Sequence, residues 1–290
     1  MMIIKSDGSK VEYDGAKLRR SISRTGARKQ LVEDVAADVE AQIKEGMTTG
    51  EIYRVVREEL KKQSSCFACR YNLRAGILKL GPAGFKFEKY VASILKAYQY
   101  NAYVPEDDLE GSCVMHEVDV IAEKNGRRFF IEAKFRNRFQ DNVDLKDTMA
   151  TWSRFLDLVD GAAVGKCPHF DEVWIVTNAQ FSDHALKFGV CKGIHMIGWN
   201  EPDERPLAGM VDNMTLYPIT VLDGMKQSEL EAFSEHDIML CREVVDFDPE
   251  ELAGKIGFSE ERASDVIAQC AEVISEHHAE NEPEHASRRT

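Results

Sequence analysis

Two features that mark other protein classes are missing from this chain: a long hydrophobic run and a P-loop. A membrane span needs roughly 18 consecutive apolar residues, and no stretch of the sequence approaches that length. The N-terminus also lacks a secretory pattern, so we expect a cytoplasmic protein without a membrane partner. No Gly-x-x-x-x-Gly-Lys-Ser/Thr run occurs, which excludes the phosphate-binding loop of P-loop ATPases.

Cysteines are too scattered to form a disulfide framework. The seven cysteines are an odd number dispersed along the chain, unlike the paired spacings of disulfide-rich secreted domains. Cys66 and Cys69 have a zinc-type spacing, but Cys113 and His116 could complete a site only if two separate segments met. Packing between helices is therefore the preferred interpretation of the first pair.

Positive charge is concentrated at the N-terminus. Residues 1–80 carry 16 Lys/Arg and 11 Asp/Glu (net +5), residues 81–217 carry 15 and 21 (net −6), and residues 218–290 carry 6 and 18 (net −12). An anion site therefore has its most favourable electrostatic setting near the N-terminus. One basic patch in the acidic middle segment also predicts phosphate contact: Arg127, Arg128, Lys134, Arg136 and Arg138.

Length and apolar content suit two or three domains, since 290 residues with 43% apolar content can bury separate cores. In the middle of the chain, residues 118–122 and 129–134 are apolar segments, and Asn125-Gly126 predicts a hairpin turn between them. Spacing predicts a helix over 145–159 and strands over 172–177 and 193–199.

The predicted hairpin brings chemically useful side chains together. Strand alternation puts Glu132 and Lys134 on one face, and the hairpin returns Asp119 beside them. Two neighbouring carboxylates suit Mg²⁺ or Mn²⁺, and a nearby lysine suits the charge of a phosphate under attack. A solvated hairpin is the alternative, but the apolar residues before Glu132 indicate a buried strand, in which unpaired charge is costly. Upstream, Glu88 lies at the border of the buried face of a predicted amphipathic helix.

Helix Glu88, strand Asp119 and strand Glu132-x-Lys134 together resemble the PD-(D/E)xK nuclease superfamily, in particular its Mrr-like restriction endonuclease branch. The resemblance covers residues 82–212 and implies a mixed sheet flanked by helices. It also implies that Glu88, Asp119, Glu132 and Lys134 are catalytic, with Asp119, Glu132 and Glu88 at a Mg²⁺ or Mn²⁺ site.

The N-terminal segment resembles a different family, the ATP-cone domain. Residues 3–14 form a predicted hairpin around Asp7-Gly8, helices follow, and Thr49 is expected to cap a helix starting at Glu51. The match covers residues 1–80 and implies that Lys5, Lys17 and Thr49 contact ATP or dATP as a regulatory nucleotide. Ser6 stands where the family usually has Arg.

The C-terminal segment, residues 217–275, is expected to be a small all-α domain. Its two glycine-centred turns look like paired helix-hairpin-helix motifs, whose backbone N–H groups face DNA phosphate. Lys226 stands where a second glycine is usual, and the acidic charge of the segment disfavours DNA, so a protein-contact or dimerisation role is at least as favoured. Residues 276–290 are expected to be a disordered tail.

The combined prediction is an α/β multidomain protein: an ATP-regulated, Mg²⁺-dependent endodeoxyribonuclease whose partners are DNA, nucleotide and a second copy of itself. Two alternatives stay open. One is a nucleotide-sensing DNA-binding or regulatory protein with an inactive nuclease fold, and the other is a nuclease that acts on RNA.

Overall fold

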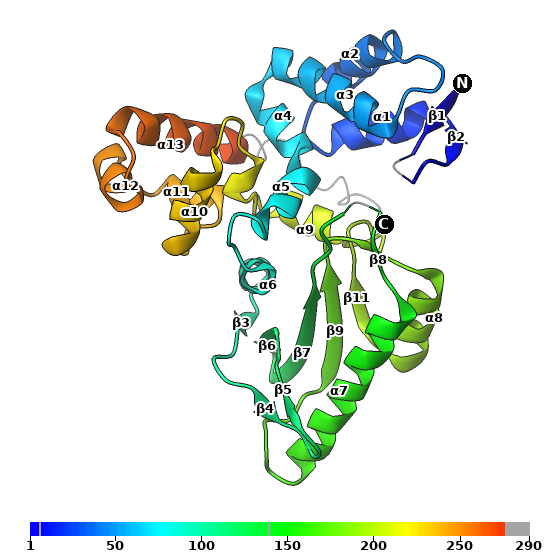
Figure 1. Ribbon diagram of the computed structural model, residues 1–290, viewed down its shortest axis with the longest axis vertical. Helices are drawn as coiled ribbons and strands as arrows, with labels where there is room; N and C mark the ends of the chain where they lie inside the picture. Colours follow the sequence, from blue (N-terminus) through cyan, green and yellow to red (C-terminus); the bar gives the residue numbers. More distant parts are fainter. Residues whose placement is uncertain (6, 139, 276–290) are drawn as a thin grey trace, which may run out of the picture.

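The computed structural model describes residues 1–5, 7–138 and 140–275. An N-terminal domain and a set of C-terminal helices lie together at one end of the molecule, and a central sheet with its helices forms the other end (Figure 1). The protein is therefore a mixed α/β multidomain protein. The expected tail, residues 276–290, falls outside the described residues.

The N-terminal domain is a short hairpin packed on helices. Its core collects apolar side chains from every element, including Ile3, Ile22 and Val56, because each helix carries apolar residues on one face at helical spacing. The elements are β1 (Met2–Ile4), β2 (Lys10–Glu12), α1 (Gly15–Ser23), α2 (Lys29–Glu40), α3 (Thr49–Gln63) and α4 (Ser65–Tyr71).

One expected cap is wrong by a residue. Helix α3 begins at Thr49, and its N-cap is Thr48. The Thr48 hydroxyl accepts a hydrogen bond from the Glu51 amide at 3.2 Å, and the Glu51 carboxylate accepts one from the Thr48 amide at 2.8 Å. This capping box satisfies two N-terminal amides, and it explains why the first of the two adjacent threonines, rather than Thr49, is the cap.

The central domain contains a five-stranded mixed sheet with the order β11-β9-β7-β6-β3. Strands β7, β9 and β11 run parallel, whereas β6 is antiparallel to both β7 and β3. The predicted hairpin is present, because Asn125 (φ 54°) and Gly126 (φ 76°) take the left-handed conformation of a tight two-residue turn. The strands are β3 (Asn101–Tyr103), β6 (Val120–Lys124), β7 (Arg127–Lys134), β9 (Glu172–Thr177) and β11 (His195–Ile197).

Helices cover both faces of this sheet. Phe129 and Ile131 of β7 pack with α6, while Phe130 packs with Phe155 and Leu158 of α7, which is the strict alternation of a strand buried on both faces. The helices are α6 (Phe87–Ala97), α7 (Leu145–Ala163) and α8 (Asp183–Lys192), and two small two-stranded ladders flank the sheet: β4 (Leu109–Glu110) with β5 (Met115–His116), and β8 (Asn142–Val143) with β10 (Gln180–Phe181).

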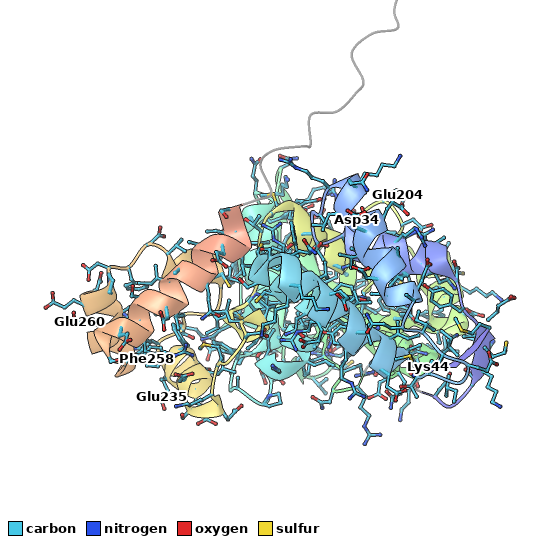
Figure 2. All side chains as sticks on the ribbon, turned by 90° about the horizontal axis from the view of Figure 1, so that it is seen from above. Asp34, Lys44, Glu204, Glu235, Phe258 and Glu260 are labelled. Atoms are coloured by element: carbon cyan, nitrogen blue, oxygen red, sulfur yellow. The ribbon has the colours of Figure 1, made fainter. Side chains whose placement is uncertain are left out.

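The C-terminal helices share a core with the central domain instead of forming a core of their own. Apolar residues of this segment, among them Tyr217, Leu240 and Val266, belong to the same buried cluster as α6. The Tyr90 hydroxyl of α6 donates to the Leu216 carbonyl at 2.9 Å. The elements are α9 (Leu207–Asn213), η1 (Ile219–Val221), α10 (Gln227–Glu235), α11 (Cys241–Val244), α12 (Pro249–Ile256) and α13 (Glu260–Ser275). Figure 2 shows Glu235 and Glu260 on the outer side of these helices, away from the N-terminal domain.

The N-terminal domain ends before residue 80. Helix α5 (Leu73–Leu80) places Leu73, Ile77 and Leu80 in the core shared by the central and C-terminal parts. Arg70, just before it, is buried and donates to the Thr25 carbonyl at 3.0 Å and to the Val273 carbonyl at 2.9 Å. The three parts of the chain therefore meet at α4 and α5.

The structure also bears on the cysteine pair of α4 and on the length and polarity of the helices. Cys66 and Cys69 are buried in α4, in agreement with a packing role. Across the described part of the chain, the helices are too short or too polar to cross a membrane.

Candidate active site

The register of the central hairpin determines where the carboxylates lie. Val120 pairs with Ile131 and Ile121 pairs with Phe130, so the next position outward sets Asp119 opposite Glu132. Ile121 and Phe130 pack against α7, and strand alternation puts Asp119, Glu132 and Lys134 on that same face. The three side chains that the sequence singled out therefore share one face at the end of β7.

Short polar contacts hold this group together. The Ala133 amide donates to Asp119 Oδ2 at 2.7 Å, which ties the start of β6 to the end of β7. Lys134 Nζ lies 2.5 Å from Glu132 Oε1, and Arg154 Nη1 of α7 lies 2.5 Å from Glu132 Oε2. The residue Glu132 is only 3% exposed, so both of its oxygens are matched by cations where water does not reach them easily.

The surroundings of Asp119 shift the pKa of its carboxyl group upward. Burial, followed by repulsion from Glu132, raises the pKa of Asp119 from 3.8 to about 6, although the Ala133 hydrogen bond and the charges of Lys134 and Arg154 oppose the shift. Two carboxylates that repel one another across a hairpin are stabilised by a cation between them. A perturbed pKa beside a specific charge partner is also a frequent sign of a functional site.

Arg154 is the member of the cluster that sequence reasoning missed. Besides Glu132, its guanidinium donates to the backbone carbonyl of Glu117, so it connects α7 to the segment leading into β6. A signal was present in the sequence: Arg154 sits four residues before Leu158 and three after Thr151, both buried. An arginine on an otherwise buried stripe predicts a carboxylate partner on the element beneath it.

Glu88 is not brought into this cluster. It lies in the first turn of α6, half-buried, and α6 packs on the opposite face of the sheet from Glu132. Within the described residues, no hydrogen bond or ion pair joins Glu88 to Asp119, Glu132 or Lys134. The expected metal set is thereby reduced to the pair on the strands.

This pair partly fits a divalent cation. Among the residues that the structure describes, no group of three or more His, Cys, Asp or Glu side chains is arranged to hold a metal. Magnesium, however, is commonly bound by one or two carboxylates plus water and substrate phosphate. Asp119 uses only Oδ2 in its hydrogen bond to Ala133, whereas Glu132 would have to exchange Lys134 or Arg154 for the metal.

The basic patch around the site is largely neutralised. Arg127 pairs with Glu172 at 2.5 Å, Arg128 with Glu123 at 2.7 Å, and Arg136 with Asp147. The expectation that this run of cations contacts phosphate therefore depends on these pairs opening. Arg136 also has a structural role, because its backbone amide and carbonyl each bond the Asn178 side chain at 2.8 Å.

The residues predicted to contact nucleotide, Lys5, Lys17 and Thr49, lie after β1, in α1 and at the start of α3. An isolated parallel bridge joins Ile4 to Thr48, so Lys5 and Thr49, the next residue in each segment, lie close together. Lys17 lies in the first turn of α1, where the Asp14 side chain accepts hydrogen bonds from the Ala16 and Lys17 amides. The Lys17 side chain is 79% exposed, and within the described residues its ion-pair partner is Asp14 at 3.9 Å, a loose surface pair that a ligand can displace.

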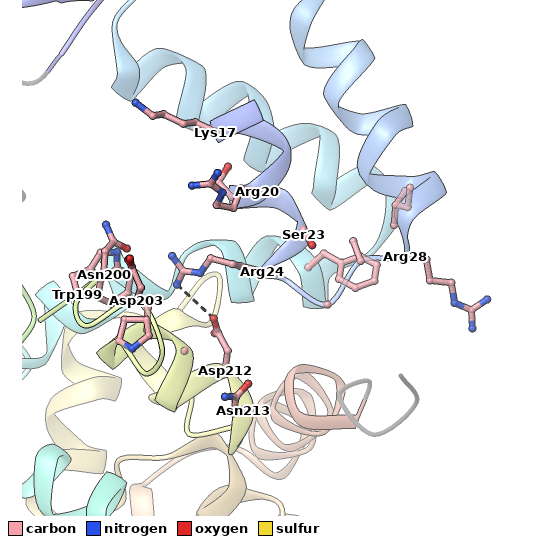
Figure 3. A pocket seen from close by; sticks show the side chains of 18 of the residues that line it. Lys17, Arg20, Ser23, Arg24, Arg28, Trp199, Asn200, Asp203, Asp212 and Asn213 are labelled. Atoms are coloured by element: carbon pink, nitrogen blue, oxygen red, sulfur yellow. Dashed lines mark hydrogen bonds and ion pairs between the residues drawn. The ribbon is translucent and has the colours of Figure 1, made fainter. Parts of the chain in front are cut away.

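Lys17 also lines a large cavity between the N-terminal and central domains. The cavity has a volume of about 1440 Å³, and α1 forms one wall while the segment from Trp199 to Asn213 forms the other. Figure 3 shows Arg24 reaching across it to Asp212, with Trp199 and Asn200 nearby. Sequence reasoning missed this cavity because its walls are almost 190 residues apart: Arg24 and Asp212 differ by 188 positions.

The two glycine turns of the C-terminal segment face one another. Gly224 (φ 74°) precedes α10 and Gly257 (φ 77°) precedes α13, and both line a second cavity of about 750 Å³. Arg262 closes it, donating to the Gly224 carbonyl at 3.2 Å and pairing with Glu229 at 2.9 Å. The pairing of turns is compatible with the helix-hairpin-helix resemblance, although Glu229 already compensates the Arg262 charge.

Two parts of the chain match known families. Residues 1–71 match the ATP cone domain family, and residues 217–274 match the family described as AF1548-like, C-terminal. The N-terminal domain is thus an ATP-cone, the type of domain that serves as a regulatory nucleotide site.

Similar proteins cover more than half of the chain. An uncharacterized protein of Archaeoglobus fulgidus is 36% identical over 166 residues, which is 57% of this chain and 90% of that protein. A crystal structure titled as a protein of unknown function, AF1548, is 33% identical with a TM-score of 0.54, covering 64% of this chain and 97% of the other. At this identity and coverage, the chain belongs to the AF1548-like family, with an ATP-cone domain at its N-terminus.

Proposed function

We propose that this protein is a nucleotide-regulated, divalent-metal-dependent nuclease that hydrolyses DNA phosphodiester bonds. The observation that carries the proposal is the meeting of Asp119, Glu132 and Lys134 on one face of adjacent strands, with Glu132 buried. Its resemblance to the PD-(D/E)xK arrangement, noted in the sequence, gives these residues their roles. The ATP-cone supports regulation by nucleotide.

In this proposal Asp119 and Glu132 hold the cation. The bound Mg²⁺ or Mn²⁺ supplies Lewis acidity and a water of lowered pKa. Lys134 offsets the negative charge of the phosphate being attacked, which is the usual contribution of a positioned cation to a charged transition state. Arg154, which projects from α7, keeps Glu132 oriented through their ion pair. Deprotonation of Asp119, whose pKa is raised to about 6, is required before it can act as a ligand.

The experiment is a cleavage assay with plasmid, linear duplex, single-stranded DNA and RNA, with Mg²⁺ or Mn²⁺ and with or without ATP. We expect Asp119→Asn, Glu132→Gln and Lys134→Ala each to lose about 10²-fold or more in rate, the usual effect of removing one transition-state charge contact. The matched control is Lys146→Ala, an exposed lysine of α7. Wild-type rates in all three site variants, measured free of contaminating nuclease, would refute the assignment.

A second candidate function is a nucleotide-sensing DNA-binding protein whose nuclease fold does not turn over. The pairing of Glu132 with both Lys134 and Arg154 favours it, because those two cations offset the charges of Asp119 and Glu132 without a metal. Calorimetric titration with Mn²⁺ discriminates the two functions. Binding that is lost in Asp119→Asn supports the nuclease, and no binding with or without DNA supports the second candidate.

A further inference from the structure

The cavity between the ATP-cone and the central domain has a wall of cations that neither the nuclease site nor the helical core explains. Lys17 and Arg20 of α1 and Arg24, the C-cap that follows it, succeed one another at helical spacing, and all three line the cavity. The opposite stripe of the same helix, Leu18 and Ile22, is buried in the domain core. Residues three and four apart share a helix face, so α1 has an inner apolar face and an outer basic face directed at the cavity (Figure 3).

Intramolecular pairing takes up part of the charge of this wall, since Lys17 Nζ lies 3.9 Å from Asp14 Oδ2. Arg19, on the flank of α1, is tied to Glu33 at 2.8 Å and Glu40 at 2.7 Å. Arg20 is exposed, and within the described residues its side chain has no hydrogen bond or ion pair. Arg24 pairs with Asp212 across the cavity at 3.4 Å. The cavity lining contains four Lys/Arg against two Asp, and Arg20 is the lining cation on which phosphate binding rests, in a chain of net charge −13.

The opposite wall leads to the candidate active site. The Trp199 amide donates to the Ala179 carbonyl at 2.7 Å, and the Ala179 amide donates to Thr177 Oγ1 at 3.1 Å. The Thr177 hydroxyl in turn donates to the Lys134 carbonyl at 2.6 Å. These contacts follow the carboxyl ends of the parallel strands β7, β9 and β11, the edge at which ligands of open α/β sheets usually bind.

The size and lining of the cavity favour a polymer over a small ligand. Its volume of about 1440 Å³ exceeds the roughly 300 to 1,000 Å³ of ordinary small-molecule pockets. Trp199 is buried, with Arg24 and Arg74 over its ring at 5.4 and 5.6 Å, so it offers no free aromatic face for a base. What remains accessible is positive charge, which binds the phosphates of a nucleic acid irrespective of its base sequence.

We propose that this interdomain cavity binds the phosphate backbone of the nucleic-acid substrate, and that Lys17 is shared between substrate and regulatory nucleotide. The inference rests on the proposed nuclease function for the identity of the substrate, but not for the binding itself. The ATP-cone is then part of the substrate surface, and bound nucleotide weakens substrate binding because its phosphates take the Lys17 charge. This gives the regulation a sign: ATP inhibits.

The test measures binding separately from cleavage. Full-length protein in EDTA, so that no strand is cut, is titrated with fluorescently labelled duplex and single-stranded DNA at several salt concentrations. Arg20→Ala is the main variant, because that side chain has no partner to lose in the described structure. Arg54→Ala is the matched control, since Arg54 is an exposed arginine of α3 in the same domain and outside the cavity lining.

Losing one phosphate contact removes about 0.9 from the slope of log affinity against log salt, which predicts about eightfold weaker binding at 0.1 M salt. We expect this for Arg20→Ala, about 60-fold for Lys17→Ala/Arg20→Ala if the two contacts are additive, and no change for Arg54→Ala. Metal-free ATP is expected to weaken DNA binding to the wild type.

Each other result has a defined meaning. Equal salt slopes for wild type and Arg20→Ala would overturn the substrate cavity while leaving the cleavage assay untouched. Binding that depends on Arg20 in a protein that never cuts DNA would uphold the cavity and refute the nuclease. If ATP or inorganic polyphosphate binds through Arg20 and DNA does not bind, the cavity is a free-nucleotide site and the proposal is wrong. Unchanged DNA affinity at saturating ATP would overturn the sharing of Lys17.

Discussion

The charged side chains of the candidate active site are buried or half-buried and paired, whereas those of the interdomain cavity are largely exposed. In the first, strand backbone positions Asp119, Glu132 and Lys134, and Glu132 meets cations at 2.5 Å on both oxygens while 3% exposed. In the second, the charges stand on the solvent side of a helix, and Lys17 is 79% exposed. Buried, paired charge is rigid and expensive to disturb, whereas exposed charge is adaptable and screened by salt. The first arrangement suits chemistry and the second suits reversible capture of an anion.

The largest expected difference concerns stability. Glu132→Gln leaves Lys134 and Arg154, each 26% exposed at the side chain, without their counter-charge. Breaking a buried pair in this way commonly costs about 3 kcal/mol. Lys17→Gln is expected to change the free energy of unfolding by less than about 0.5 kcal/mol, as for other surface substitutions. Urea unfolding of both variants without metal checks this, and equal losses would show that the Glu132 pairs are no more structural than a surface lysine.

For nucleotide affinity, we expect the exposed lysines of the ATP-cone to matter more than the buried Glu132 cluster. Lys5→Ala/Lys17→Ala is expected to weaken ATP binding by about 150-fold, close to 3 kcal/mol, because two hydrogen bonds to charged phosphate are lost and each contributes at least about 1.5 kcal/mol. The matched double variant Lys10→Ala/Lys29→Ala removes two other exposed lysines of the domain and should bind normally. Calorimetry measures both affinities. Because no P-loop is present, we also expect no steady ATP turnover, and hydrolysis by the ATP-cone would contradict the regulatory role.

The sequence predicts the candidate active site better than the interdomain cavity, because the first is built from local contacts and the second from distant segments. The pairing of Asp119 with Glu132 lies within a hairpin, and strand period plus an Asn-Gly turn are local signals that specify register. Arg154 was missed because helix spacing shows which face is buried but not which strand residue it meets. The N-cap of α3 is Thr48 and not the predicted Thr49, because either of two adjacent threonines satisfies the sequence pattern of a helix N-cap. The cavity was beyond prediction, since Arg24 and Asp212 meet only after three separate segments have packed.

A pH experiment sharpens the electrostatic side of the comparison. Burial raises the pKa of Asp119 to about 6 from 3.8, so the folded protein holds this proton more tightly than the unfolded chain. The resulting stabilisation is complete below pH 4 and is lost as the pH rises through 6. Asp119→Asn cannot ionise, and its stability relative to wild type is expected to improve by up to about 2 kcal/mol between pH 4 and 7, at 1.36 kcal/mol per pKa unit. A difference that stays constant over this range would refute the shifted pKa.

The smallest expected effect lies at the contact that spans the cavity. Arg24 Nη2 lies 3.4 Å from Asp212 Oδ2, and the Tyr217 hydroxyl donates to Oδ1 at 3.1 Å. Burial raises the pKa of Asp212 to about 6 even though Arg24 opposes the shift, so the arginine compensates only part of the cost of burying the carboxylate. Because the Arg24 side chain is 37% exposed, solvent screening limits this pair to about 1 kcal/mol or less.

A double-mutant cycle of Arg24→Ala and Asp212→Asn isolates that pair energy at pH 7.5, where wild-type Asp212 is ionised. We expect a coupling of about 0.5 to 1 kcal/mol in urea unfolding, and a smaller coupling at pH 5, where protonation of Asp212 removes its charge. The same variants should reduce the effect of ATP on DNA binding only if nucleotide, besides occupying Lys17, changes how the two walls of the cavity pack, because a ligand shifts a conformational equilibrium only through contacts that differ between the two states. If the coupling is zero at both pH values while the ATP response is intact, the regulatory signal passes through Lys17 alone, and Arg24 serves only to pack the ATP-cone against Trp199.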